Sequence, residues 1–234
     1  KIGIALLIFI GLIFVLFCMV LIMPSEEYET VNYDIPNMRD YYTHIKGNGE
    51  DKVTLMVYMV GSDLESDGGA ASEDIAEMAA ANADNINITL QTGGAAEWEN
   101  ASISDGKTER HIIKNGELQN VENLGETQMT SPNTLTDFIK WSAANYPADR
   151  YELVLWNHGG GTALGFGYDE MYPDDMLSLS QIGNALSDSG IKFDIVGFDA
   201  CLMGTIETAY MLEPYADYLV ASEEYEPGTG WYYS

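Results

Sequence analysis

Basic residues are scarce in this chain of 234 residues. It contains 10 Lys and Arg against 37 Asp and Glu, which gives a formal net charge of −27. Such an excess repels phosphate backbones and anionic lipid headgroups, so we expect no nucleic-acid partner. The same charge keeps an exposed protein soluble, and it attracts cationic partners or calcium.

Cysteine is equally scarce, with Cys18 and Cys201 as the two examples. Cys18 lies inside a long apolar run, where a small lipid-facing side chain is sufficient explanation. Cys201 is then the lone thiol of the remaining chain and has no partner for an intramolecular disulfide. Its presence requires another explanation.

The apolar run covers residues 2–23 and contains no charged residue. It exceeds the roughly 18 apolar residues that mark a membrane-spanning helix, whereas the apolar part of a cleavable signal peptide has about 7 to 15. We therefore predict a transmembrane helix or signal anchor. Lys1 before the run, and the acidic residues after it, favour an extracytoplasmic location for the rest of the chain. The predicted localisation is single-pass in the cell membrane, or secreted if the segment is cleaved.

The remaining chain reads as a polar linker at 24–50 and one domain at 51–234, long enough to bury a core. The linker is rich in polar residues and contains Gly47-Asn48-Gly49, with no sustained periodicity. Because the sequence starts with Lys1 and not Met, we expect it to be a stretch of a longer protein.

Strand and helix patterns alternate along this domain. Short apolar runs that are typical of strands cover residues 53–60, 86–91, 151–156, 194–198 and 218–222. Helix signals lie between them: Ser72 as an N-cap, Ser131-Pro132 as a start, a capping box at Ser178 and Gln181 with a stop at Gly190, and a helical stretch at 203–213. Asn115-Gly116 predicts a hairpin within 108–123. The alternation predicts an α/β fold with a mainly parallel sheet flanked by helices.

Two chemically distinctive segments come directly after strands. Asn157-His158-Gly159 comes after 151–156, and Asp199-Ala200-Cys201 comes after 194–198. Parallel strands end at one edge of a sheet, so His158 and Cys201 are expected to share a cleft. An imidazole there can help to form the thiolate, or can protonate a leaving amine. A helix beginning within a residue or two of Cys201 would favour the thiolate further. Backbone N–H groups in the glycines after His158 could stabilise an oxyanion.

Each of these residues has an ordinary structural explanation when taken alone. A cysteine at a strand end is often a small buried hydrophobe, a histidine after a strand is often a hydrogen-bonding loop residue, and adjacent glycines often form a turn. Their coincidence at one sheet edge is the reason to favour catalysis.

The segments ELVLWNHGGG and FDIVGFDACLMG resemble the two catalytic blocks of clostripain-like cysteine peptidases, which are related to caspases, gingipains and legumains. TLMVYMVGSDLES is similar to the family's first core strand and turn, and ASEEYEPGTGW to the block after the catalytic strand. The likeness covers about residues 52–234. It implies a caspase-like fold, with His158 as the catalytic histidine and Cys201 as the nucleophile.

The same resemblance implies an oxyanion hole formed by the N–H groups of Gly159 and Cys201. It also implies that Asp199 lines a pocket for a basic side chain, although a helix N-cap near residue 202 is an equally good explanation of this aspartate. Because relatives usually extend further, we expect the catalytic region to be truncated at its C-terminus.

One feature departs from the family pattern. Relatives are often activated by cleavage after a basic residue in the region beyond the histidine, but residues 159–191 contain no Lys or Arg, and Lys192 is the basic residue before Cys201. The intervening loop carries Asp169, Glu170, Asp174 and Asp175. These residues form a calcium site, a pseudosubstrate-like cover or a solvated acidic loop.

The predicted function is that of an extracytoplasmic, membrane-anchored cysteine endopeptidase that acts through a thioester on protein or peptide substrates. We expect a preference for Arg or Lys before the scissile bond, and no required cofactor, with calcium retained as a candidate. The alternative is a catalytically silent surface module of the same fold that binds a peptide or other ligand. A nucleotide loop is not supported, because the glycines are not succeeded by Gly-Lys-Ser/Thr.

Overall fold

The computed structural model describes residues 46, 49–81 and 85–234. All of them belong to the second of two compact units into which the chain divides, residues 33–234. The predicted transmembrane helix at 2–23 and nearly all of the predicted linker at 24–50 lie outside the described residues. Within those residues, no helix has the length and apolar character needed to cross a membrane.

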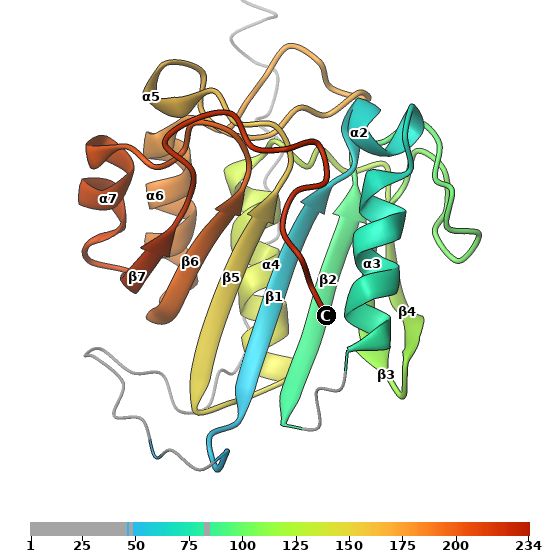
Figure 1. Ribbon diagram of the computed structural model, residues 1–234, viewed down its shortest axis with the longest axis horizontal. Coiled ribbons are helices and arrows are strands. Elements are labelled where there is room, and N and C mark those ends of the chain that lie inside the picture. Colours follow the sequence, from blue (N-terminus) through green and yellow to red (C-terminus); the bar gives the residue numbers. More distant parts are fainter. Residues whose placement is uncertain (1–45, 47–48, 82–84) are drawn as a thin grey trace, which may run out of the picture. The chain divides into compact units, whose positions relative to one another are not determined.

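The described part of the chain contains a seven-stranded sheet in the order β4-β3-β2-β1-β5-β6-β7 (Figure 1). The strands are β1 Val53–Val60, β2 Ile86–Gly93, β3 Thr108–Lys114, β4 Glu117–Gly125, β5 Arg150–Trp156, β6 Phe193–Asp199 and β7 Ala216–Val220. From β2 to β7 the paired strands run parallel, whereas β3 pairs antiparallel with β2 and with β4. The prediction of a mainly parallel sheet is confirmed.

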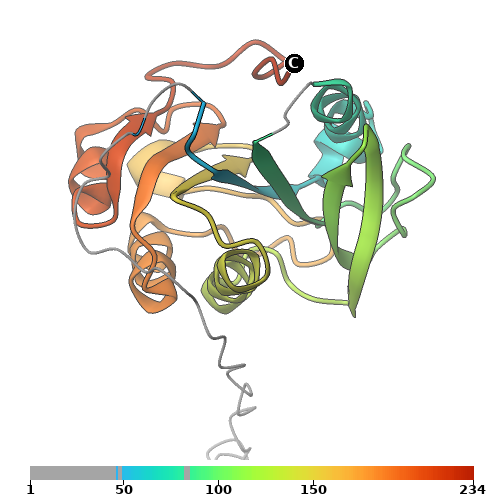
Figure 2. The same cartoon turned by 90° about the horizontal axis from the view of Figure 1, so that it is seen from below.

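Helices cover both faces of this sheet. They are α2 Ser62–Ser66, α3 Ala70–Ala80, α4 Pro132–Asn145, α5 Gly161–Leu164, α6 Leu179–Ser189 and α7 Ile206–Leu212. Figure 2 shows α4 and α6 on one face, with α3 and the C-terminal stretch on the other. Strand β1 packs Met56 and Tyr58 into the hydrophobic core on one face of the sheet, and Val57 and Met59 into the core on the other face. Burial on both sides explains why its sequence is apolar without alternation.

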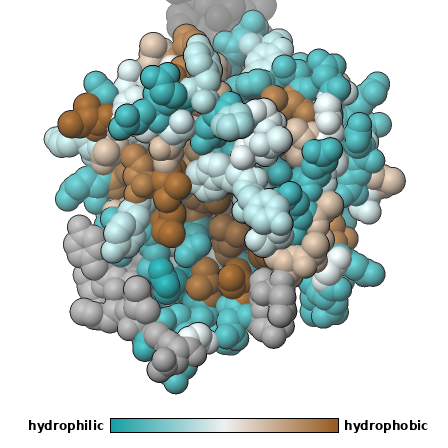
Figure 3. Space-filling model, in the orientation of Figure 1, coloured by the Kyte–Doolittle hydropathy of each residue, from teal (hydrophilic) through white to brown (hydrophobic). Residues whose placement is uncertain are grey.

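The face that bears α3 is less completely covered. Beyond β1 it is crossed by the C-terminal stretch, whose Trp231 lies so close to Gly197 that a Cβ there would be 2.5 Å from the indole ring. Tyr218 and Val220 of β7 remain exposed. Figure 3, in the orientation of Figure 1, shows apolar side chains at the surface on this face.

Several local predictions are confirmed by the backbone. Asn115 and Gly116, the turn between β3 and β4, have φ angles of 56° and 77°, as a type I′ turn requires. The capping box at Ser178 and Gln181 is formed, and Gly190 ends α6 with a φ of 70°. Helix α4 begins at Pro132 after Ser131, although the Ser131 side chain forms no capping hydrogen bond.

Two predicted helix starts differ from the structure and were wrong. Helix α3 begins at Ala70 after a left-handed Gly69, so Ser72 lies inside the helix, and its hydroxyl hydrogen-bonds to Glu65 instead of capping the end. Helix α7 begins at Ile206, with Thr205 as its N-cap, and not at residue 203. The glycine in the first case and the Thr205 hydroxyl in the second supply better ends than the residues that the pattern favoured.

Candidate active site

Strands β5 and β6 present His158 and Cys201 at the same edge of the sheet. They are paired in parallel with Trp156 opposite Asp199, and each of the two candidate residues lies two positions beyond its strand's member of that pair. The Asn157 N–H donates to the Asp199 carbonyl oxygen at 3.2 Å, which continues the pairing beyond the strands. The expectation that both residues face one cleft is confirmed, since both line the same cavity.

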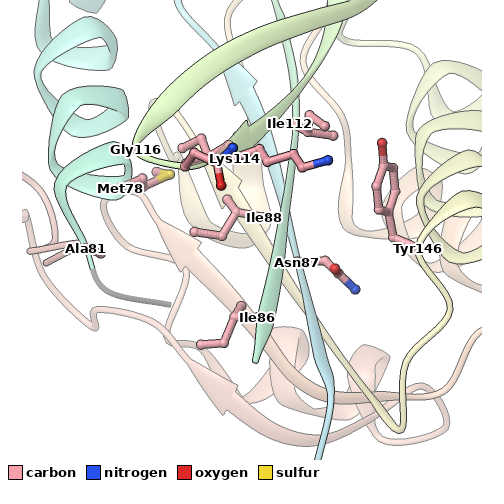
Figure 4. Close-up of a pocket in the computed structure, with 11 residues that line it drawn as sticks. Met78, Ala81, Ile86, Asn87, Ile88, Ile112, Lys114, Gly116 and Tyr146 are labelled. Carbon is pink, nitrogen blue, oxygen red and sulfur yellow. The ribbon is translucent and has the colours of Figure 1, made fainter. Parts of the chain in front are cut away.

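This cleft has a volume of about 480 Å³ and a strongly acidic lining. Its carboxylates come from Asp63, Asp67, Glu73, Asp74, Asp199 and Glu226. Neither Lys nor Arg is among the described residues that line it. A larger hollow of about 560 Å³ lies at the opposite, amino end of β2, between Met78, Ile86, Lys114 and Tyr146 (Figure 4). No Cys or His is among the described residues that line that hollow, so the chemistry identifies the smaller cleft as the candidate site.

Cys201 sits in a tight turn between β6 and α7. It is a free, half-buried thiol whose Sγ accepts the Glu226 N–H at 3.3 Å. The next residue, Leu202, has a positive φ of 63°, a conformation that costs a non-glycine residue roughly 1–2 kcal/mol. Strain of this kind persists where the surroundings impose it, and functional sites are one such place.

The helix expected to start beside Cys201 starts later. Because α7 begins only at Ile206, its positive end is not adjacent to the sulfur, and the dipole argument for a stabilised thiolate fails. The chain after β7 lies beside the Cys201 turn instead. It fixes this turn by accepting hydrogen bonds from the Leu202 N–H at the Glu224 carbonyl (3.0 Å) and from the Gly204 N–H at the Ser222 carbonyl (2.7 Å).

His158 makes a direct contact that the sequence did not predict. Its Nε2 lies 2.9 Å from Oδ1 of Asp63, and the two side chains are 41% and 47% exposed. Burial opposes ionisation of Asp63, but the hydrogen bond and charge of His158 outweigh it, so the pKa of Asp63 is lowered. The available sequence signal was the Gly61-Ser62-Asp63 turn that ends the first strand.

Gly159 brings the loop after β5 against the backbone of Cys201. A Cβ at this position would lie 2.0 Å from the Cys201 carbonyl oxygen and 2.9 Å from Met203 Cγ. The sequence suggested that these glycines let the backbone approach a substrate. The close approach that Gly159 permits in the structure is between the loop after β5 and the loop after β6. No hydrogen bond within the described residues uses the N–H of Gly159 or of Cys201.

Asp199 lies deep in the cleft and is 5% exposed. Its Oδ2 accepts hydrogen bonds from the Tyr233 hydroxyl (2.7 Å) and the Trp231 N–H (3.2 Å). Burial raises its pKa, against the effect of these hydrogen bonds. The N-cap explanation of Asp199 is wrong, because the nearest helix starts at Ile206 and is capped by Thr205.

Two further acids share this environment. Burial raises the pKa of Asp74 to about 7, although a 2.7 Å hydrogen bond from the Trp156 indole opposes the shift. Burial also raises the pKa of Glu226, and the neighbouring Asp199 carboxyl adds to the effect. Asp74 carried no sequence signal, since an isolated Asp resembles a solvated surface residue until tertiary packing buries it. Glu226 lies in the segment ASEEYEPGTGW, but its resemblance to a family block assigned no role to this residue.

The acidic loop after His158 has mainly structural contacts. Asp169 is buried and accepts the N–H groups of Met129 (2.7 Å) and Met171 (2.9 Å). Glu170 accepts the Ser66 hydroxyl (2.6 Å) and the Ala96 N–H (2.8 Å).

Asp174 and Asp175, the other two acids of this loop, are exposed. The described residues contain no group of three or more His, Cys, Asp or Glu side chains arranged to hold a metal ion. Lys192, the one basic residue between His158 and Cys201, has a side chain only 12% exposed and directed at the Pro214 carbonyl (3.3 Å).

A model described as the clostripain family matches residues 57–234. Clostripain from Hathewaya histolytica is 36% identical over 126 residues, which cover 46% of this chain and 24% of that protein.

Solved structures are also similar. A secreted C11 cysteine protease from Bacteroides thetaiotaomicron, in complex with an irreversible peptide inhibitor, matches with a TM-score of 0.65 and 22% identity, over 78% of this chain and 51% of that one. An inactive zymogen C11 protease from Parabacteroides distasonis gives a TM-score of 0.58 and 26% identity, over 77% and 51%. The chain thus spans about a quarter of the curated relative and half of each solved chain. Because the family model matches most of its length, the chain belongs to the clostripain family, C11.

Proposed function

We propose that this chain provides the catalytic centre of a cysteine endopeptidase, with Cys201 as nucleophile and His158 as its acid–base partner. The observation that carries the proposal is the shared cleft: both residues lie just beyond adjacent parallel strands at equal register and line one cavity. Membership of the clostripain family supports the same chemistry.

In the proposed reaction the Cys201 sulfur, as thiolate, attacks the scissile carbonyl carbon and forms a C–S bond. The C–N bond then breaks as His158 transfers a proton to the leaving amine, which leaves a thioester. Water adds to the thioester carbonyl, the C–S bond breaks, and the new carboxylic acid departs as the thiol is restored. The Glu226 N–H, which already donates to Sγ at 3.3 Å, stabilises negative charge on that sulfur.

The oxyanion of the tetrahedral intermediate would be bound by the N–H groups of Gly159 and Cys201. Support comes from their position beside the nucleophile and from the absence of any hydrogen bond to them within the described residues. Loss of one such donor typically costs about 10²–10³ in kcat. Gly159 also brings its loop within reach because it has no side chain to meet the Cys201 carbonyl.

The acidic lining supports a preference for Arg or Lys before the scissile bond. Six carboxylates line the cleft with no Lys or Arg among its described residues, so a cationic side chain gains favourable interactions there while an acidic one is repelled. Asp199 is one of the two buried acids of the cleft, with Asp74, and an entering cation would favour its ionised form. We therefore propose Asp199 as the main recognition residue.

Peptide cleavage tests these assignments together. The chain should cleave fluorogenic peptides with Arg or Lys before the scissile bond under reducing conditions, and Cys201→Ala should not. Asp199→Asn should reduce kcat/KM for Arg peptides by about 10- to 100-fold, the effect of losing one hydrogen bond to a charged group, while an otherwise identical Gln peptide changes little. Intact peptides at every tested residue type, together with an unlabelled Cys201 after treatment with a thiol-directed peptide inhibitor, would refute the peptidase assignment.

Two further arms address the ion and the alternative function. We propose calcium as a candidate activator because of the acidic surface, so each assay should be run with added calcium and with a chelator. Peptides that raise the melting temperature without being cleaved would instead support a catalytically silent binding module.

We also propose that residues 2–23 anchor the domain on the outer side of a membrane, on the strength of their uncharged apolar length. Extraction of the full chain from membranes tests this assignment: carbonate should leave it in the pellet, and detergent should release it. Release by carbonate alone would contradict an anchor.

A further inference from the structure

We propose that Asp63 is a positioning residue for His158, so that the site works through Cys201, His158 and Asp63 and not through the first two alone. The inference rests on the proposed peptidase function but adds a third residue from a different part of the chain. Asp63 is the second residue of α2, just beyond β1, and its carboxylate lies 2.9 Å from the histidine Nε2.

The contact defines which ring nitrogen is available for chemistry. An ionised carboxylate accepts hydrogen bonds but cannot donate them, so Nε2 must carry the proton in the Asp63 hydrogen bond. Nδ1 of His158 then remains to exchange a proton with the thiol or the leaving amine. The lowered pKa of Asp63 is consistent with this role, because the residue must stay ionised.

The turn before Asp63 has features that hold this carboxylate near His158. Ser62 is fully buried and has a positive φ of 51°, a conformation that disfavours any residue with a Cβ. Asn157, the residue before His158, holds this turn through its amide, which donates to the Val60 carbonyl (2.5 Å) and the Ser62 hydroxyl (2.7 Å). One buried amide therefore fixes the loop that carries Asp63 to the loop that carries His158.

The other end of the same amide is also engaged, because Asn157 Oδ1 accepts the Tyr168 N–H at 2.6 Å. Positive φ angles occur next to Asp63 and next to Cys201, at Ser62 and Leu202. Maintaining a strained turn to hold a half-exposed carboxylate has little value for stability, since an exposed ion pair contributes about 0–1 kcal/mol. Its value is explained if the carboxylate orients the catalytic ring.

Charge alone does not account for the pair. Asp67 and Glu73 line the same cleft, yet among the described residues Asp63 is the carboxylate that forms an ion pair with His158. This difference supplies a matched control. Asp67→Asn removes one negative charge from the same cleft and from the same turn of chain without touching the histidine.

Steady-state kinetics distinguish a residue that orients His158 from one that only adds negative charge to the cleft. Asp63→Asn and Asp63→Ala should lower kcat by about 10- to 100-fold with KM changed less than about threefold, the range found when carboxylates that orient metal-bound histidines are lost. Asp67→Asn should raise KM for an Arg peptide and leave kcat within about twofold. Asp63→Glu should recover part of the lost kcat. Equal kcat values for wild type and Asp63→Ala, in folded proteins of similar melting temperature, would overturn the proposal.

A second measurement does not depend on turnover. In ¹⁵N spectra of labelled histidine, the neutral ring of His158 should carry its proton on Nε2 in the Cys201→Ala protein, and Asp63→Ala should lose this single-tautomer signature. An unchanged spectrum would overturn the positioning role even in an active enzyme. If the tautomer changes as expected but the chain with Cys201 intact cleaves no peptide, the contact between Asp63 and His158 is upheld and the peptidase function is refuted.

Discussion

Replacement of Gly159 by alanine gives a direct test of how closely the loops that carry His158 and Cys201 must approach. The added Cβ would lie 2.0 Å from the Cys201 carbonyl oxygen, and real Cβ atoms essentially never come closer than 3.0 Å to such an atom. The loops must therefore separate by about 1 Å. Neither side yields easily, because the obstructing atom belongs to the backbone and the Leu202 and Gly204 N–H groups anchor the adjoining turn.

A displacement of this size can reduce catalysis about 10²-fold, and overpacking of a closed site typically costs about 1–3 kcal/mol of stability. We expect Gly159→Ala to lower kcat/KM for an Arg peptide by about 10²-fold. The rate of Cys201 alkylation by iodoacetamide should change as well, and the melting temperature should fall by several degrees.

Gly228→Ala is the matched control. A Cβ at Gly228 meets nothing within 4 Å, and its φ is not in the left-handed region, so the melting temperature and the alkylation rate should stay close to wild type. Wild-type stability and kinetics in Gly159→Ala would refute the reasoning, because they would show that the loops tolerate the wider separation.

Three further changes test the packing and electrostatics of the fold. Burial raises the pKa of Asp74 from 3.8 to about 7, so the folded state binds this proton more tightly and the free energy of unfolding declines as pH rises between those values. Asp74→Asn should remove this decline. The variant should be more stable at pH 8 by about 1–3 kcal/mol, below the ceiling of about 4 kcal/mol that the shift allows. Melting curves from pH 5 to 8 measure this difference, and parallel curves would contradict it. Arg110 is buried against two carboxylates and a tryptophan ring, so Arg110→Ala should cost about 3–5 kcal/mol in urea denaturation, whereas Lys107→Ala, in an exposed pair, should cost at most about 1 kcal/mol. Ser178→Ala removes the capping box of α6 and should cost about 1 kcal/mol, against almost nothing for Ser180→Ala on the same helix.

Much of the fold could be predicted from local sequence patterns. Strand β1 was predicted correctly from Val53 to Val60 because burial on both faces favours a nearly continuous apolar run, which only Thr54 interrupts. The Asn115-Gly116 turn and the capping box of α6 are equally clear, since each depends on residues that only a few positions separate. The position of His158 and Cys201 at one sheet edge was also predictable from sequence, because each lies just beyond a strand whose partner the crossover rule predicts.

The start of α7 was not predictable in the same way. An apolar stretch from residue 203 fits a helix, but the turn around Cys201 is held by hydrogen bonds from the chain after β7, and a local pattern contains no information about that partner. The same limit applies to Asp199, whose hydrogen bonds come from Trp231 and Tyr233, more than thirty residues later.

The sequence by itself determined the order of strands and helices along the chain, the acidity of the chain, and the placement of one thiol and one imidazole just beyond two strands, because these depend on composition and short-range periodicity. Only the tertiary structure placed Asp63 against His158, across 95 positions of chain, and buried Asp74 so that its pKa rises. Such contacts form when separate strands meet at one sheet edge, and the distances and burial that give a carboxylate its role exist only after that packing.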